Sequence, residues 1–211
     1  MSEPQHRDAY LEAVLPPDPA RDAIRRDLLE RGWPDMCVPV ALGRLLTQLA
    51  MGSVSAIEIG TYAGYSAICI ARGLSPGGRL LTLESRREHA ELAAQHIEAA
   101  GLGHRVEIAL GDAAETLAHL RANERRFHLA FVDAHKPSYP RYLDLLLDLM
   151  HPGGLMVFDN AFGRDRALDP SATSPTPTAL RELHRRLFED ERLVSTLLPM
   201  FDGVAIARVR P

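Results

Sequence analysis

Short apolar runs alternate with amphipathic stretches along most of the chain. Five such runs follow one another between residues 54 and 158, and helices are predicted between them near residues 64–73, 87–100, 112–121 and 138–150. Strands that are apolar throughout and separated by helices are typical of a parallel sheet covered on both faces. The pattern therefore predicts a doubly wound α/β sheet. The five runs are Val54–Ile59, Leu80–Leu83, Val106–Leu110, Leu129–Val132 and Leu155–Phe158.

The N-terminal part departs from this alternation. Residues 19–31 predict an amphipathic helix, and Val40–Ala50 repeat leucine at helical spacing. We therefore expect residues 1–50 to form a helical cap on a core of residues 51–211. A length of 211 residues suits one buried core, so we expect a single domain over the whole chain.

The C-terminal part departs in a different way. A helix is predicted near residues 177–189, and two strand-like runs follow it, Leu193–Leu198 and Val204–Val209. The turn residues Asp202 and Gly203 lie between these runs, so we expect an antiparallel hairpin with a short loop. Five parallel βα units that end in a hairpin make a mixed sheet.

The composition excludes several classes of function. A hydrophobic content of 46% indicates a globular chain, and a net charge of −4 provides no basic excess for nucleic acid or an anionic membrane. We expect neither a signal peptide nor a membrane span, because no apolar run nears the ~20 residues that cross a bilayer. Cys37 and Cys69 lack metal-ligand spacing, which predicts a reduced, cytoplasmic protein without a disulfide scaffold.

A glycine loop follows the first apolar run. Gly60 and Gly64 are separated by three residues, whereas a dinucleotide site requires G-x-G-x-x-G, and Glu58 would repel a nearby phosphate. Glu84 ends the second run, where a carboxylate can accept both hydroxyls of a ribose. The loop and Glu84 together predict a nucleoside ligand without a diphosphate. The alternative is that the glycines only make a tight turn.

Two carboxylates and an amide follow the fourth and fifth runs. Asp133 ends one run, and Asp159 and Asn160 end the next. Because uncompensated carboxylates crowded at one sheet edge are costly, we expect a hard cation there, Mg²⁺ first, with Mn²⁺ or Ca²⁺ as alternatives. Asp159 and Asn160 can share a metal only if the chain turns between them.

Lys136 is the single lysine among 24 lysines and arginines. Arginine does not lose its proton at accessible pH, whereas a lysine near a metal or in a dry pocket can act as a base. The position of Lys136, three residues after Asp133, therefore predicts a proton acceptor. The alternative is an ordinary ion pair with a neighbouring carboxylate.

Six motifs together resemble one known family. They are EIGTYAGYS, LLTLE, LGDA, VDAHK, PGGLMVFDN and DGVAIARV, in order and with compatible spacing from about Met36 to Arg208. The chain resembles the cation-dependent class I O-methyltransferases of the catechol and caffeoyl-CoA type, which use S-adenosylmethionine (SAM). The resemblance implies a Rossmann-like fold, a homodimer, and methylation of a hydroxyl on a catechol-like or phenylpropanoid small molecule.

The resemblance also implies roles for single residues. Lys136 matches the proposed base, and Asp133, Asp159 and Asn160 match the three metal ligands. The positions that match the cofactor site are Met36 and Val38, which close over it, Glu58, Gly60, Thr61 and Ser66 at the methionine end, Glu84 at the ribose, Ala113 at the adenine, and Asp133, His135 and Tyr142 beside the cofactor.

Two positions depart from the family's pattern. His135 stands where an acid usually faces the cofactor, and Leu183-His184 replaces a Phe-Asn pair that lies near the acceptor in relatives. We expect the polar loop 163–177 to rim the acceptor site. Two other functions stay open, a nicotinamide-dependent oxidoreductase on a similar sheet and a non-catalytic SAM-binding protein. Surface or loop-end positions are expected for His89, His96, His104, His119 and His128.

Overall fold

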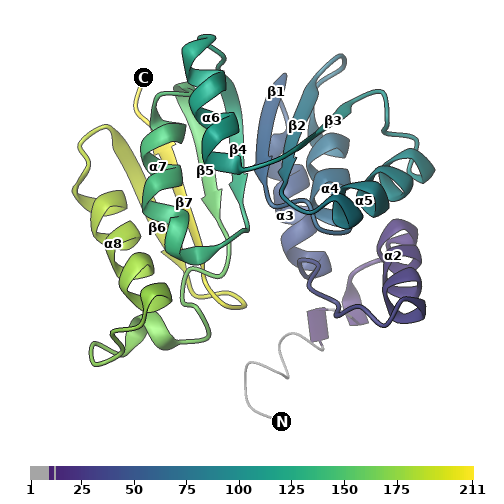
Figure 1. Ribbon diagram of the computed structural model, residues 1–211, viewed down its shortest axis with the longest axis horizontal. Coiled ribbons are helices and arrows are strands. Elements are labelled where there is room, and N and C mark those ends of the chain that lie inside the picture. Colours follow the sequence, from purple (N-terminus) through teal and green to yellow (C-terminus); the bar gives the residue numbers. More distant parts are fainter. Residues whose placement is uncertain (1–9, 12) are drawn as a thin grey trace.

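A seven-stranded sheet runs through the centre of the molecule in the order β3-β2-β1-β4-β5-β7-β6 (Figure 1). The structure is a computed structural model and describes residues 10–11 and 13–211. The strands are β1 (Ser55–Ile59), β2 (Arg79–Glu84), β3 (Val106–Leu110), β4 (Phe127–Val132), β5 (Met150–Phe158), β6 (Leu193–Leu198) and β7 (Val204–Val209).

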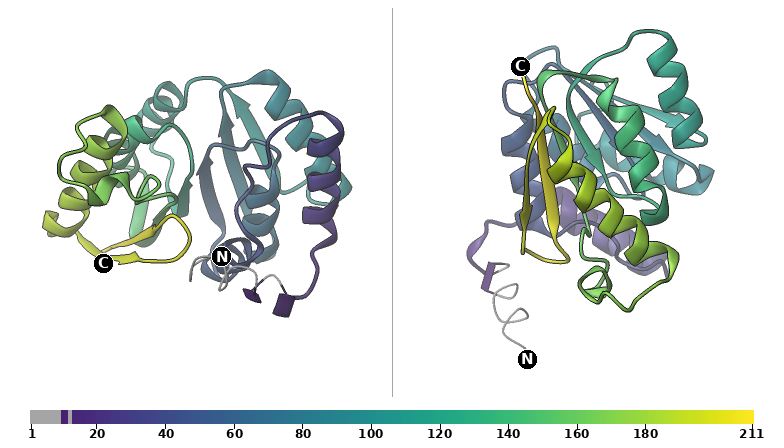
Figure 2. Two further views of the ribbon diagram at one scale, coloured as in Figure 1. Left: turned by 90° about the horizontal axis from the view of Figure 1, so that it is seen from below. Right: turned by 90° about the vertical axis from the view of Figure 1, so that its left-hand side faces the viewer.

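Helices cover both faces of this sheet (Figure 2). One face packs against α6, α7 and α8, and the other against α2, α3, α4 and α5, so that two apolar cores lie on opposite sides of the strands. The helices are α2 (Pro19–Glu30), α3 (Val40–Ala50), α4 (Tyr65–Gly73), α5 (Arg87–Ala99), α6 (Ala113–Ala122), α7 (Tyr139–Leu147) and α8 (Pro175–Glu189), with short 3₁₀ helices η1 (Lys136–Ser138) and η2 (Arg166–Leu168).

The strand order reverses at β1. This strand pairs in parallel with β2 on one side and with β4 on the other. Its side chains alternate between the two cores, with Ile57 and Ile59 facing α6–α8 and Ala56 facing α3 and α4. The predicted Rossmann-like, doubly wound arrangement is confirmed. In such sheets, the crevice outside the carboxyl ends of the strands at the reversal is the usual ligand site.

The C-terminal hairpin enters the sheet in a way that its sequence does not specify. β6 and β7 pair antiparallel as predicted, but it is β7 that also pairs with β5, which leaves β6 at the edge. Because Ala205 lies opposite Phe158, the loop before β7 reaches the carboxyl end of β5. There the Ala161 N–H donates to the Gly203 carbonyl at 2.9 Å. The hairpin loop thereby becomes part of the site edge.

Most predicted elements end within two residues of the observed ones, but the region 138–155 differs more. The helix predicted over 138–150 ends at Leu147, and β5 begins at Met150, well before the predicted Leu155. A register shift against β4 between Phe127 and Leu129 accommodates the Pro-Gly-Gly segment of this strand. Because a proline and two glycines are typical of a loop, the sequence pattern did not predict the first half of β5.

The described part of the predicted cap comprises α2, α3 and their connections, while residues 1–9 and 12 lie outside the described residues. The Asp18 side chain accepts from the Ala20 N–H at the start of α2 and from Arg72 and Tyr65 of α4, at 3.1, 2.7 and 3.1 Å. These bonds hold the cap against the core. Within residues 10–11 and 13–211, no helix is long and apolar enough to cross a membrane.

Candidate functional site

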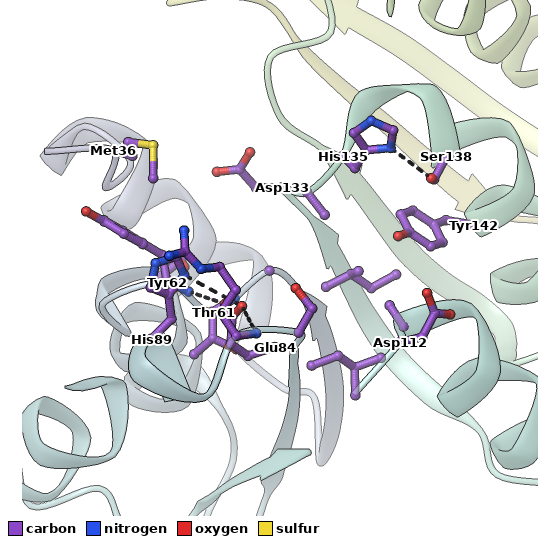
Figure 3. Close-up of a pocket in the computed structure, with 18 of the residues that line it drawn as sticks. Met36, Thr61, Tyr62, Glu84, His89, Asp112, Asp133, His135, Ser138 and Tyr142 are labelled. Atoms are coloured by element: carbon purple, nitrogen blue, oxygen red, sulfur yellow. Dashed lines mark hydrogen bonds and ion pairs between the residues drawn. The ribbon is translucent and has the colours of Figure 1, made fainter. Parts of the chain in front are cut away.

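Two cavities lie at the carboxyl edge of the strands, where the order reverses. The first has a volume of about 400 Å³, and the second about 640 Å³. Figure 3 shows the first cavity between the glycine loop with Glu84 on one side and Asp112, Tyr142 and His135 on the other. All predicted cofactor positions except Glu58 line it, namely Met36, Val38, Gly60, Thr61, Ser66, Glu84, Ala113, Asp133, His135 and Tyr142.

The glycine loop has a conformation that only small residues allow at two positions. Gly60 has a φ of 98°, and a Cβ there would collide with the Asp133 carbonyl oxygen, so β1 and β4 meet without a side chain between them. Gly64 has a φ of 88° at the start of α4, with Ala93 of α5 packed against it. The loop backbone therefore lies close to both neighbouring elements, which leaves its upper surface free to approach a ligand.

Glu84 organises this loop through backbone bonds. Its Oε2 accepts from the N–H groups of Tyr62 and Thr61 at 2.9 and 3.3 Å, and its Oε1 accepts from the Arg86 N–H at 2.9 Å. The His89 Nδ1 lies 3.6 Å from the same Oε1. A carboxylate held by backbone donors keeps lone pairs for a ligand's hydroxyls, which suits the predicted ribose contact.

Glu58 lies beneath the loop and does not line the cavity. Its side chain is fully buried, its Oε2 accepts from Thr82 at 2.5 Å, and Thr82 in turn contacts Thr61 at 2.5 Å. Burial raises the pKa of the Glu58 carboxyl to about 8. Its other oxygen, Oε1, has no hydrogen-bond partner among the described residues. The buried series of hydrogen bonds from Thr61 through Thr82 to Glu58 therefore ends at Oε1, which the described residues leave without a partner.

The opposite wall of the first cavity consists of helix beginnings. Asp112 caps α6 by accepting from the Glu115 N–H at 3.0 Å, and Ala113 follows it at the cavity wall. His135 lies beside Ser138, with 3.2 Å between Nδ1 and Oγ. Tyr142 of α7 completes this wall, as Figure 3 shows. Small and aromatic side chains thus leave a flat space opposite Glu84.

The second cavity is lined by two of the three predicted metal ligands and by the predicted base. The Lys136 Nζ lies 2.7 Å from Asp133 Oδ1, and Lys136, Asp133 and Asn160 all line the cavity. The chain turns at Asn160, whose φ is 50°, and the Asn160 N–H donates to Asp159 Oδ1 at 2.7 Å. The turn on which a shared cation depends is therefore present. Asp159 itself is 4% exposed and does not line the cavity.

The donor set at this edge suits a hard cation. Burial first, and the charge of Asp133 second, raise the pKa of the Asp159 carboxyl to about 7. A cation beside two such carboxylates would offset both effects. In the described part of the chain, no group of three or more His, Cys, Asp or Glu side chains converges on one point. The three predicted ligands include an amide, Asn160, and an all-oxygen set of this kind would suit Mg²⁺, Mn²⁺ or Ca²⁺.

Four residues line both cavities: Met36, Tyr62, Asp133 and Ala134. Met36 comes from the segment between α2 and α3, Tyr62 from the glycine loop, and the other two from the end of β4. The Tyr62 hydroxyl donates to the Pro34 carbonyl, which ties the glycine loop to the N-terminal segment. Ligands in the two cavities would therefore meet at these four residues.

The expectation that five histidines lie at surfaces or loop ends is wrong for two of them. His89 is buried in the first cavity, against the rings of Trp33 and Tyr62 at centroid distances of 5.3 and 4.9 Å. His96 bridges α5 to Ala63 and Asp27 at 2.9 and 3.1 Å. Helical position alone could not reveal these partners, because they come from α2 and the loops.

Sequence reasoning also missed Tyr62 as a site residue, and it placed Leu183 and His184 near the acceptor. Tyr62 lies inside the glycine loop motif, so its position was a usable signal. Leu183 belongs to α8 and is fully buried in the core. Neither Leu183 nor His184 is among the described residues that line the two cavities. Residues of the loop after β5 line the second cavity instead, which agrees with the predicted rim.

Comparisons with known proteins agree with the site. The chain matches a family model described as "O-methyltransferase" over residues 18–210. The catechol O-methyltransferase of Niastella koreensis is 35% identical over 96% of both chains. The caffeoyl-CoA O-methyltransferase of Petroselinum crispum is 31% identical over 93% of this chain and 86% of its own.

Solved structures show the same similarity in three dimensions. An O-methyltransferase from Bacillus cereus in complex with SAH is 32% identical, with a TM-score of 0.90 and 97% of each chain covered. TomG, an O-methyltransferase from Streptomyces achromogenes solved with SAM, is also 32% identical, with a TM-score of 0.90 and 100% of each chain covered. These likenesses do not support the nicotinamide alternative. The chain is an enzyme of the O-methyltransferase family, with catechol and caffeoyl-CoA O-methyltransferases among its relatives.

Proposed function

We propose that this enzyme transfers a methyl group from SAM to a hydroxyl of a catechol-like or phenylpropanoid small molecule. The observation that carries the proposal is the pair of cavities that share Met36, Tyr62, Asp133 and Ala134. One cavity contains most of the predicted nucleoside positions, and the other is lined by Asp133, Asn160 and Lys136. A donor and an acceptor bound side by side in this way need only a short in-line transfer.

The first cavity supplies the contacts that SAM requires. Glu84 accepts the ribose hydroxyls, while Ala113, His135 and Tyr142 enclose the adenine opposite it. The methionine end lies over Gly60, Thr61 and Ser66, above the buried Glu58. The buried Glu58 supports this orientation, because a positively charged ligand group above its unsatisfied Oε1 would favour the ionised form of a carboxyl whose pKa burial raises. Relatives whose structures contain SAH or SAM have the same fold.

Asp133, Asp159 and Asn160 are the residues that would hold a divalent cation. When bound, such an ion lowers the pKa of a coordinated phenolic hydroxyl and so favours the nucleophilic oxyanion. Its protein ligands come from β4 and from the turn after β5, at the edge of the second cavity. Their fit to an oxygen-liganded ion supports the proposal.

Lys136 is the proposed base. In the reaction, the acceptor oxygen attacks the sulfonium methyl, the new C–O bond forms as the C–S bond breaks, and S-adenosylhomocysteine leaves. The hydroxyl proton passes to Lys136 Nζ, and Asp133, which lies 2.7 Å from that nitrogen, stabilises the resulting ammonium. Lys136 and Asn160 line the same cavity, which places the base beside the proposed ligand set.

The enzyme's setting is also proposed from its family resemblance and composition. We propose that residues 1–50, as far as the structure describes them, act as a cap within one domain of residues 1–211, and that the enzyme works as a cytoplasmic homodimer on small molecules. The contribution of Met36, Cys37 and Val38 to the first cavity supports a role of the cap in holding the cofactor. The net charge of −4 agrees with a partner that is not nucleic acid.

The decisive experiment measures SAM binding and methyl transfer in the same samples. We expect calorimetric SAM binding with or without EDTA, and methylation of caffeic acid with Mg²⁺ that EDTA abolishes. The Asn160→Ala variant should retain SAM binding, and its turnover should respond less to added Mg²⁺ than that of the wild type. SAM binding without methylation of any catechol would overturn the acceptor assignment, and full activity in EDTA would overturn the metal assignment. Failure to bind SAM would overturn the whole proposal.

A further inference from the structure

Both acidic and basic side chains line the second cavity. Lys136 and Asn160 lie at the sheet edge, where the proposed chemistry takes place. The loop after β5 contributes Arg164 and Arg166 to the same cavity. A catechol ring bound at the sheet edge would therefore have basic side chains available to its substituent. The proposed reaction itself makes no use of either arginine.

Other parts of the protein hold the arginine-bearing loop in a defined shape. The Phe162 N–H donates to the Asp202 carbonyl at 2.8 Å, and the Arg164 N–H donates to Asp202 Oδ1 at 2.6 Å. Arg164 and Asp165 both have left-handed backbone conformations, with φ of 56° and 61°. Such non-glycine conformations persist only when surrounding structure determines them, and they gather at ligand sites. The hairpin loop before β7 supplies this support.

Arg166 is fixed at a second point. Its guanidinium donates to Ser174 Oγ at 2.7 Å, at the residue that precedes α8. Arg181 of α8 holds the intervening loop by donating to the carbonyls of Asp169 and Ala172 at 3.0 and 2.6 Å. Arg166 therefore lies on a segment tied to α8, and Arg164 on one tied to the hairpin. Both arginines therefore lie on segments that hydrogen bonds hold in place.

The carboxylates around this cavity already have partners in the protein. Asp133 pairs with Lys136, and Asp35 pairs with Arg21, each at 2.7 Å. Asp202 accepts from the Arg164 N–H, so its carboxylate is used to shape the loop. Within the described part of the chain, neither Arg164 nor Arg166 has a carboxylate at ion-pair distance. Burial raises the pKa of the Asp202 carboxyl and the charge of Arg164 acts to lower it, but neither guanidinium forms a close ion pair among the described residues.

We propose that the natural acceptor bears an oxyanion, a carboxylate or a phosphate, on the side chain of its catechol ring, and that Arg164 and Arg166 bind it. This inference rests on the proposed function and narrows its substrate class. Guanidinium groups bind carboxylates and phosphates through paired, charge-assisted hydrogen bonds. With the oxyanion held at the loop, the ring hydroxyls point toward Lys136 and Asn160. Arg164 and Arg166 thereby determine which acceptors are selected.

The test compares acceptors that differ only in side-chain charge. Caffeic acid, its methyl ester and a phosphate-bearing catechol are assayed with the wild type and with the Arg164→Gln/Arg166→Gln double variant. We expect the wild type to prefer the acid over the ester by about 10-fold or more in kcat/KM, mostly through KM, as for a hydrogen bond to a charged group. The double variant should lose that preference. The phosphate compound shows which oxyanion the site favours.

Arg185→Gln is the matched control, because Arg185 is an arginine of α8 whose ion-pair partners among the described residues are Glu182 and Glu189 of its own helix. It should keep the wild-type preference. Equal kcat/KM for acid and ester in the wild type, or an equal loss for both in the double variant, would overturn the inference. Calorimetric binding of the acid and the ester to the SAM-loaded protein decides it independently of turnover. Failure of the proposed function would instead appear as SAM binding without methylation of any acceptor.

Discussion

The first and second cavities are neighbours that share four residues, yet they are built by opposite means. The first rests on buried strand ends and on a glycine loop packed closely against its neighbours, with Glu84 bound by three backbone N–H groups. The second is closed by loops that come from distant parts of the chain and carry exposed arginines. A shared cofactor favours the first kind of construction, and acceptors that vary favour the second.

Gly60→Ala should give the largest effect, because it attacks the point where the first cavity is built. The new Cβ would collide with the Asp133 backbone and occupy a φ of 98°. We expect a loss of roughly 2–4 kcal/mol in unfolding free energy and no measurable SAM binding. Denaturant unfolding and calorimetry measure both effects.

Gly77→Ala is the control for that substitution. Gly77 also has a positive φ, of 75°, but a Cβ there would have nothing within 4 Å. It should lose only about 1 kcal/mol of stability and keep SAM binding. If both variants lost the same stability, the close approach of β1 and β4 at Gly60 would not matter to the site.

Lys136→Arg separates the two cavities by chemistry. The variant places a permanent positive charge beside Asp133 and replaces a group that can accept a proton with one that cannot. We expect turnover to fall about 100-fold or more while SAM affinity stays within a factor of two of wild type. Steady-state kinetics and calorimetry on the same preparation measure this. Unchanged turnover would remove Lys136 from the role of base.

The pH dependence of stability tests the buried floor of the first cavity. The folded pKa of Glu58, about 8, lies above its ordinary value of 4.5, so folding favours the protonated form. The stability that Glu58 contributes is therefore fully present below about pH 4.5, and it is lost as the pH rises toward 8. Glu58→Gln should flatten part of that decline. The rest of the decline should remain in this variant, because the pKa of Asp159 is also raised.

Denaturant unfolding from pH 5 to pH 8.5, without ligand, compares the two proteins. The difference should reach a few kcal/mol at most at the alkaline end. Parallel curves for wild type and Glu58→Gln would show that Glu58 is already ionised at neutral pH, and the account of its buried, protonated state would be wrong.

Arg21→Gln should give the smallest effect, since it loosens a segment that the two cavities share. Arg21 pairs with Asp35 at 2.7 Å, next to Met36, whereas Arg25 reaches the same carboxylate only at 4.0 Å and is mostly exposed. We expect Arg21→Gln to cost about 1 kcal/mol or less and to raise KM modestly for both SAM and acceptor. Arg25→Gln should change neither value in the same assays.

Local patterns along the chain were enough to predict the parallel core, the glycine loop and Glu84, whereas the other positions of the first cavity came from the resemblance to the family. Strand alternation, the glycine spacing and Glu84 at a strand end are short-range features, and their geometry follows from backbone sterics. The sequence predicted that Asp159 and Asn160 could share a metal only if the chain turns there, and the structure contains that turn at Asn160. Glu58 matched the same motif, yet it lies below the cavity as part of a buried chain to Thr82 and Thr61.

The sequence by itself therefore determined the α/β class, the edge of the sheet where the site lies and the residue types gathered there. Only the tertiary structure decided that β7 lies between β5 and β6, because either hairpin strand could pair with β5. That choice brings Asp202 to the loop that presents Arg164 and Arg166. It also decided that His89 is buried against Trp33, since its partners lie more than 25 residues away in the chain. Contacts between distant segments depend on packing, and a local pattern does not encode which partner wins.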